Sequence, residues 1–209
     1  VDYRKREITD SHALDLRALS FQDVERYFSC PCQFLNDANA GAYAEGIQSG
    51  EAAPFFYLSL SNTVGGAVYR DGSLVYGSEF RCGEVGHMTV VPDGLPCYCG
   101  KKGCLDSYCT AKVLANRTGG RLEAFFEGLE EGQPELAAAW EQYTDYLALA
   151  VNNIRMILGC DIVLGGYVGS YAAGYLEGIR KKAASRNTFL EDGGFVKACR
   201  YKVGAAALG

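Results

Sequence analysis

A histidine and three cysteines lie close together in the segment GHMTVVPDGLPCYCGKKGCLDSYC, residues 86–109. Imidazole and thiolate groups are the usual ligands of a structural zinc ion, which binds four of them in tetrahedral geometry. Gly100 and Gly103 lie among the thiols, and glycine allows a loop to turn sharply around a metal. The pattern therefore favours a zinc-binding loop. Its four candidate ligands are His87, Cys97, Cys99 and Cys104.

The spacing of these ligands differs from that of the common paired Cys-x-x-Cys zinc motifs, so spacing alone leaves other roles open. One is a disulfide and another is a set of reduced thiols in the core. The chain has nine cysteines, an odd number, which favours a reducing cytoplasm over a secreted disulfide scaffold. Reduced core thiols would not explain the surrounding glycines and prolines.

Two pairs of polar residues indicate a ligand site. Asn36 and Asp37 lie where a strand-like segment meets an Ala-rich helical one, and side chains there can project from a sheet edge towards a ligand. Helix capping is the alternative role for this pair. Glu84 precedes His87 by three residues in a glycine-flanked turn, so both side chains can face one pocket. An ordinary solvated carboxylate is the alternative for Glu84.

The segment LSNTVGGAVYRDG has the composition of a phosphate-binding turn between two strands. Backbone N–H groups of such a turn can surround a phosphate. Its candidate residues are Asn62, Thr63, Gly65 and Gly66. A hairpin turn without any ligand is equally consistent with this segment.

Hydrophobic periodicity predicts an α/β fold with a mixed sheet. Asp71-Gly72 between two β-rich runs predicts a hairpin. The segment 117–135 is expected to be a surface helix and its connection. Strands are expected at 32–37, 55–61, 64–70, 73–76, 160–166 and 194–201. Helices are expected at 20–28, at 38–46 with a stop at Gly46, at 105–116, over 134–158 and from the glycine turn to about 184.

Composition excludes several classes of protein. Apolar residues make up 48% and charged residues 22%, which are ordinary globular values. The net charge is −5 and no Lys/Arg cluster is long enough to follow a phosphate backbone, so direct nucleic-acid binding is not expected. No apolar run approaches the roughly 20 residues of a membrane span. The first ten residues, VDYRKREITD, lack the apolar core of a signal peptide.

Four segments together resemble the ROK family of sugar kinases and sugar-responsive transcriptional repressors. They are NDANAGAYAE, VGGAVYRDGSLVYG, GEVGHMTVVPDGLPCYCGKKGCLD and DIVLGG, and the resemblance runs from about residue 30 to the C-terminus. Glu-x-Gly-His followed by Cys-x-Cys-Gly-x-x-Gly-Cys is its most specific part. The resemblance implies an actin-like (ribonuclease H-like) ATPase lobe with a mixed sheet and an embedded zinc-binding loop. It also implies that residues 1–46 are the last part of a first lobe and that residues 47–209 form the C-terminal lobe. The N-terminal part of the family fold would then be absent from this chain.

The resemblance assigns roles to individual residues. The histidine and the three cysteines of the loop would bind structural zinc. Asp37 would be the general base in a kinase, and His87 would offer one ring nitrogen to zinc and the other to sugar. Gly165 and Gly166 match the nucleotide loop. The positions that match sugar-binding residues are Asn36, Asp37, Glu84, His87 and Asp106.

The chain departs from the kinase pattern of the family at several points. Nothing in it matches the Asp-x-Gly-x-Thr phosphate motif. The second phosphate loop has Ser61-Asn62-Thr63 where kinases have Gly-Thr-Gly, which adds Cβ atoms near the phosphate. Asp106 replaces a glutamate, and Tyr167 places bulk in the adenosine loop.

These departures favour the sugar-sensing domain of a ROK-type transcriptional regulator. It would be cytoplasmic, would bind a monosaccharide effector, would contact DNA only through an N-terminal domain outside this chain, and would form dimers or tetramers. The alternative is a fragment of an ATP-dependent, glucokinase-like sugar kinase. A third possibility, a zinc-stabilised binding domain without a sugar ligand, requires the Asn-Asp and Glu-x-Gly-His matches to be coincidental.

Overall fold

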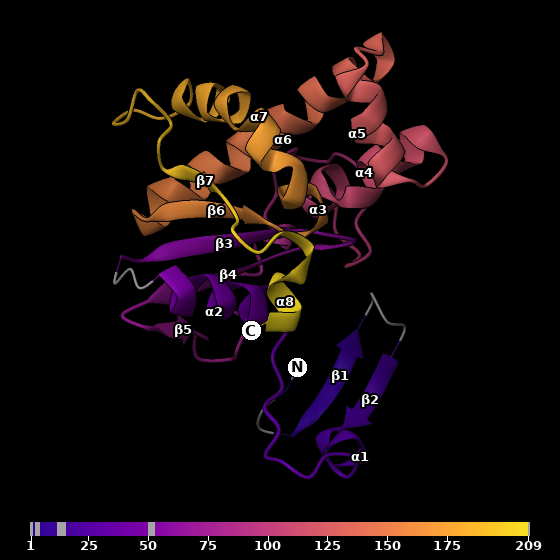
Figure 1. Ribbon diagram of the computed structural model, residues 1–209, viewed down its shortest axis with the longest axis vertical. Helices are drawn as coiled ribbons and strands as arrows, with labels where there is room; N and C mark the ends of the chain where they lie inside the picture. Colours follow the sequence, from indigo (N-terminus) through magenta and orange to yellow (C-terminus); the bar gives the residue numbers. More distant parts are fainter. Residues whose placement is uncertain (1, 3–4, 12–15, 50–52, 209) are drawn as a thin grey trace.

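A five-stranded mixed sheet forms the centre of the computed structural model, which describes residues 2, 5–11, 16–49 and 53–208 (Figure 1). The strand order is β5-β4-β3-β6-β7. Strand β4 is antiparallel to β3 and β5, whereas β6 is parallel to β3 and β7. The predicted mixed sheet is thereby confirmed. The strands are β3 Phe55–Leu60, β4 Val64–Arg70, β5 Ser73–Val75, β6 Asp161–Gly165 and β7 Val196–Ala198.

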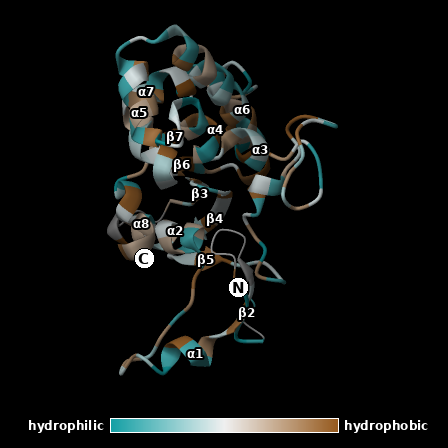
Figure 2. Cartoon of the chain, turned by 90° about the vertical axis from the view of Figure 1, so that its right-hand side faces the viewer, coloured by the Kyte–Doolittle hydropathy of each residue, from teal (hydrophilic) through white to brown (hydrophobic). Residues whose placement is uncertain are grey.

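Helices cover both faces of this sheet (Figures 1 and 2). Helices α2 (Asp37–Ser49) and α8 (Ala205–Leu208) lie on one face, and α6 (Pro134–Leu158) and α7 (Gly166–Ala184) lie on the other. All six residues of β3 are buried, as expected of a central strand covered on both sides. Three shorter helices, α3 Asp106–Cys109, α4 Ala111–Ala115 and α5 Leu122–Glu130, lie on the side of α6 and α7.

The long helix α6 has the predicted bounds and supplies much of the core. It begins with a proline in its first turn and ends at Gly159, whose φ of 64° is the left-handed conformation that favours glycine. The Trp140 ring stacks on Tyr143 at a centroid distance of 5.5 Å. The buried residues of α6 recur at steps of three or four, which is the pattern of a half-buried helix. The buried stripe includes Leu136, Trp140, Tyr143, Leu147, Val151 and Ile154.

Several predicted bounds are wrong, and the physical reasons are local. The expected strand at 32–37 has no regular structure, and Asp37 already begins α2. Gly46 does not end that helix, which continues to Ser49. A Cβ at Gly46 would lie 2.3 Å from Cζ of Tyr69, so the glycine lets α2 pack closely on β4. The helix expected at 105–116 is broken at Thr110, whose backbone is extended.

Other expectations are met in part. The helix expected at 20–28 is the shorter α1, Phe21–Glu25, whose first turn is capped by the Ser20 hydroxyl. The strand expected at 194–201 is reduced to β7. The expected helix within 117–135 is α5. The Asp71-Gly72 hairpin is confirmed, with φ of 53° and 77° at the two turn residues.

An N-terminal hairpin, which periodicity did not predict, pairs β1 (Glu7–Ser11) with β2 (Leu16–Ser20). Together with α1 it lies away from the central sheet, below α2 and α8 in Figure 1. Phe21 stacks on Phe34 with the ring centroids 4.0 Å apart. Among the described residues, no helix has the length and apolar character that crossing a membrane requires.

Candidate functional site

The turn Ser61–Thr63 between β3 and β4, here called the phosphate turn, is held by two hydrogen bonds from distant segments. The backbone N–H of Ala111 donates to the Ser61 carbonyl at 2.8 Å. The N–H of Val64 donates to Oδ1 of Asp106 at 2.6 Å. Asp106 is only 7% exposed, so this carboxylate oxygen fixes the start of β4 against α3. The residue predicted to bind sugar therefore also has a structural contact.

The conformation of the phosphate turn suits non-glycine residues, because neither Asn62 nor Thr63 has a positive φ. The two glycines that follow differ in their surroundings. A Cβ at Gly66 would lie 2.2 Å from the Phe56 ring, whereas the nearest atom to a Cβ at Gly65 is the Ala38 Cβ at 3.6 Å. Packing of the sheet therefore requires Gly66, and Gly65 has room for a side chain.

Asn36 and Asp37 lie at the N-terminal end of α2. Oδ1 of Asn36 accepts a hydrogen bond from the Asn39 N–H at 2.7 Å, which makes Asn36 a helix cap. Asp37 is exposed, and its Oδ1 accepts from the Ala38 N–H at 2.9 Å. Asp37 lines a cavity of about 230 Å³, together with the three residues of the phosphate turn. The fold thus places the candidate base beside the candidate phosphate-binding turn.

Glu84 and His87 belong to a short segment that packs against the start of β4. They stand at the ends of a 3₁₀ turn, Val85–His87, whose middle residue is Gly86. A Cβ at Gly86 would lie 2.0 Å from the Val64 carbonyl oxygen, so only glycine allows this approach to the start of β4. Glu84 is exposed and His87 is half-buried.

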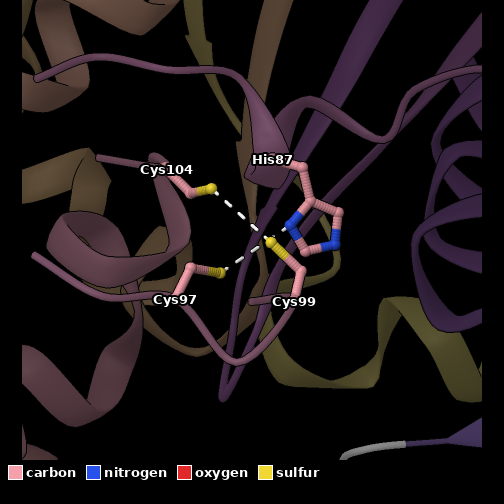
Figure 3. A group of neighbouring side chains, drawn as sticks. All are labelled: His87, Cys97, Cys99 and Cys104. Atoms are coloured by element: carbon pink, nitrogen blue, oxygen red, sulfur yellow. Dashed lines mark hydrogen bonds between the residues drawn. The ribbon is translucent and has the colours of Figure 1, made fainter. Parts of the chain in front are cut away.

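The histidine and the three cysteines converge in space, as Figure 3 shows. Their ligand atoms all lie within 4.8 Å of one another. Sγ of Cys99 lies 3.8 Å from Sγ of Cys104, and Sγ of Cys97 lies 3.9 Å from Nδ1 of His87. Zinc–sulfur bonds of about 2.3 Å at tetrahedral angles place two thiolates about 3.8 Å apart. The cluster therefore has the donor types and dimensions of a four-ligand metal site.

The loop backbone supports this cluster. Gly100 and Gly103 have φ of 82° and 76°, as the sequence predicted. A Cβ at Gly103 would clash with the Val91 carbonyl. The N–H of Lys101 lowers the pKa of the Cys99 thiol, whereas burial raises the pKa of Cys104 to about 12.

Tyr98, between two of the ligands, is a site residue that the sequence analysis missed. Its hydroxyl lies 3.3 Å from Nε2 of His87, the ring nitrogen that does not face the cysteines. Burial raises the pKa of this hydroxyl, and the negative charges of Asp106, Glu84 and the two neighbouring thiolates, Cys97 and Cys99, raise it further. Tyr98 therefore lies among the predicted sugar-binding groups. A sugar hydroxyl that reaches Nε2 must displace it.

Gly165 and Gly166 end β6 and begin α7 beside the phosphate turn. The N–H of Gly166 donates to the Tyr57 hydroxyl at 3.3 Å. Gly166 has a φ of 75°, and a Cβ there would lie 2.5 Å from Oγ of Ser61. Glycine is thus required for the N-terminal end of α7 to approach the turn.

Three cavities meet at the phosphate turn. The largest, of about 740 Å³, lies between α4 and α7 and is lined mainly by small and apolar residues; its size is typical of a small-molecule site. The cavity of about 230 Å³ contains Asp37, and a third, of about 270 Å³, contains Tyr98 and Asp106. Asn62 lines all three. Sequence spacing had no signal for the largest cavity, although Tyr167, which lines it, was singled out as bulk near a nucleotide.

Comparisons with known proteins identify the family and the fold of this chain. The sequence profile of the ROK family matches residues 1–206. An N-acetylmannosamine kinase of Vibrio cholerae is 30% identical over 172 residues, which are 79% of this chain and 60% of the relative. The chain therefore spans about 60% of the length of this curated relative.

Two solved structures share the fold over 100% of this chain. One is a ROK family glucokinase from Streptomyces griseus in complex with glucose and AMPPNP, with a TM-score of 0.84, 23% identity and 76% of that chain covered. The other is a ROK family transcriptional regulator, a homologue of the E. coli MLC protein, with a TM-score of 0.78, 19% identity and 59% of that chain covered. The predicted actin-like ATPase fold with its mixed sheet is confirmed. Because a kinase and a regulator share this fold, the fold does not separate the two functions.

Proposed function

Because this chain belongs to the ROK family, we propose that it supplies the catalytic base and the nucleotide-binding surface of an ATP-dependent sugar kinase. The sequence analysis favoured a regulator, and the kinase was its alternative. The kinase is now the better-supported hypothesis, because the curated relative with 30% identity is a sugar kinase. The site geometry supports the same choice.

The placement of Asp37 is the observation on which this proposal depends. Its carboxylate lines the same cavity as Ser61, Asn62 and Thr63. A sugar hydroxyl in that cavity can give its proton to Asp37 while its oxygen attacks the terminal phosphorus of ATP. The new sugar O–P bond forms as the bond to the leaving oxygen breaks, and ADP departs. Donors of the phosphate turn would stabilise the charge on the transferred group.

We propose that the metal in the loop is structural zinc, held by His87 and the three cysteines. A site with four protein ligands is closed, so the ion would fix the loop and would not activate water. The loop would then hold His87 towards the sugar, with Tyr98 as its partner in the absence of sugar. Metal binding would also add to the folding free energy, because the ligands converge only in the folded chain.

We propose a monosaccharide substrate, with N-acetylmannosamine as the first candidate because of the Vibrio relative. The residues proposed to bind its hydroxyl groups are Asn36, Asp37, Glu84, His87 and Asp106. Carboxylates suit this role because a vicinal diol can donate two hydrogen bonds to one of them. Assembly into dimers or tetramers stays a prediction.

A sugar-responsive regulator is the second candidate, supported by the side chains at Asn62 and Thr63 and by the fold shared with the MLC homologue. Measuring binding and turnover on the same protein separates the two. The intact protein is titrated with a panel of monosaccharides and assayed for sugar-dependent ADP release. A kinase binds and turns over at least one of them. A sugar that binds without any turnover supports the regulator, whose DNA contact would then come from a separate N-terminal domain.

A further inference from the structure

Two of the three cavities at the phosphate turn share a wall. The cavity of about 740 Å³ is suited to a nucleoside, and the cavity of about 230 Å³ contains Asp37. The residues that line both are Asn62, Tyr167, Lys202 and Val203. A nucleotide whose base occupies the larger cavity and whose terminal phosphate reaches Asp37 must pass along this wall with its phosphate chain.

Lys202 is the charged residue among the described residues that line both cavities. Lys112 lines the larger cavity but not the one that contains Asp37. A lysine ammonium is a compact charge with three donors, and hydrogen bonds from it to phosphate oxygens are strong. We propose that Lys202 binds the phosphate chain of the nucleotide and directs its terminal phosphate towards Asp37. This inference rests on the kinase proposed above.

The backbone around Lys202 is held in place from the same helix that positions the base. The N–H groups of Arg200 and Tyr201 both donate to Oε1 of Glu45, at 2.7 and 3.0 Å. Glu45 is 8% exposed and belongs to α2, which begins at Asp37. The segment that presents Lys202 is therefore fixed to the helix that presents the base.

Lys202 also has a φ of 45°, a conformation that glycine adopts at less cost. Strained backbone of this kind clusters at ligand-binding sites in proteins. The need for a cation follows from the phosphate turn, where the side chains of Asn62 and Thr63 limit how closely the backbone N–H groups approach a phosphate. Lys202 lines both cavities together with Asn62, so its ammonium can supply this charge beside the turn.

Titration of adenosine, ADP and ATP into the intact protein tests this role, because adenosine lacks the phosphates. Lys202→Gly suits the local φ and removes only the side chain. We expect it to weaken ADP and ATP binding about tenfold while adenosine binding is unchanged. Lys202→Arg should retain most of the affinity. Lys181→Ala, an exposed lysine of α7 outside both cavity walls, is the matched control and should change nothing.

The possible results are distinct. If Lys202→Gly weakens adenosine as much as ADP, the side chain does not act on the phosphates and the inference is wrong. If the wild-type protein prefers ADP over adenosine and Lys202→Gly keeps that preference, the inference is also wrong, while the nucleotide cavity of the proposed kinase stands. If none of the three ligands binds to the wild-type protein, the kinase proposal fails and the role of Lys202 fails with it.

Discussion

Replacing Asp106 separates its structural contact from its proposed contact with sugar. Its buried Oδ1 accepts the Val64 N–H at 2.6 Å, so Asp106→Ala leaves that N–H without this acceptor. The loss of a buried hydrogen bond to a charged group costs about 1.5–3 kcal/mol. Asp106→Asn keeps an oxygen at the same place and loses only the charge. It should therefore lower the free energy of unfolding by about half as much as Asp106→Ala does. Both variants should lose sugar affinity by about tenfold.

Thermal unfolding and calorimetric titration together measure these effects. For a chain of this size, 2 kcal/mol corresponds to a fall in Tm of about 4–8 °C. We therefore expect a clear fall in Tm for Asp106→Ala and a smaller one for Asp106→Asn. An unchanged Tm in Asp106→Ala would show that the contact with Val64 does not support the phosphate turn. If Asp106→Asn keeps the full sugar affinity, Asp106 does not bind the sugar.

Three further predictions concern the candidate zinc-binding loop and the two glycines of β4. Metal analysis should find about one zinc per chain, and Cys104→Ser should lower both zinc content and Tm; a variant of equal stability without metal would contradict a structural role. Tyr98→Phe should raise sugar affinity about threefold in calorimetric titration, because it removes the internal partner of His87 Nε2; a fall in affinity would instead show that the phenol contacts the sugar. Gly66→Ala should lower the free energy of unfolding, measured with urea, by about 1–3 kcal/mol, because a Cβ there clashes with the Phe56 ring. Gly65→Ala has room for its Cβ and should change this free energy by less than about 1 kcal/mol. Equal losses of stability in the two variants would contradict the packing argument.

The features that could be predicted from the sequence are those that depend on residues close to one another along the chain. The four candidate metal ligands are close in sequence, and glycines with positive φ mark the turns between them, so the cluster could be recognised before its geometry was known. The strands β3 and β4 are short apolar runs bounded by turn residues, which is a reliable pattern. The 25-residue helix α6 has a long apolar stripe and a glycine at its end.

The features that were missed depend on contacts between distant residues. Gly46 is a helix stop by local rules, but the Tyr69 ring of β4 makes it a packing position inside α2. The bond between Asp106 and Val64 joins residues that are 42 positions apart. Lys202 and Asn62 line the same cavity because the segment that precedes α8 is bonded to α2. The spacing of residues in the sequence does not predict contacts of this kind.

The placement of Tyr98 has a similar cause. The Cys-x-Cys spacing places its backbone between two ligands, but the direction of its side chain is set by the fold of the whole loop. His87 meets it from a different segment, the 3₁₀ turn that Gly86 allows to approach Val64.

The role of Asp37 as base is the central claim, and the turnover of its amide variant tests it most directly. Asp37→Asn keeps the shape of the side chain and an oxygen for the Ala38 N–H, but it cannot accept the proton of the sugar hydroxyl. With ATP and a sugar that the intact protein binds, sugar-dependent ADP release should fall at least about a hundredfold, while the sugar Kd changes by less than about tenfold. Turnover within a few-fold of wild type in Asp37→Asn would contradict the account.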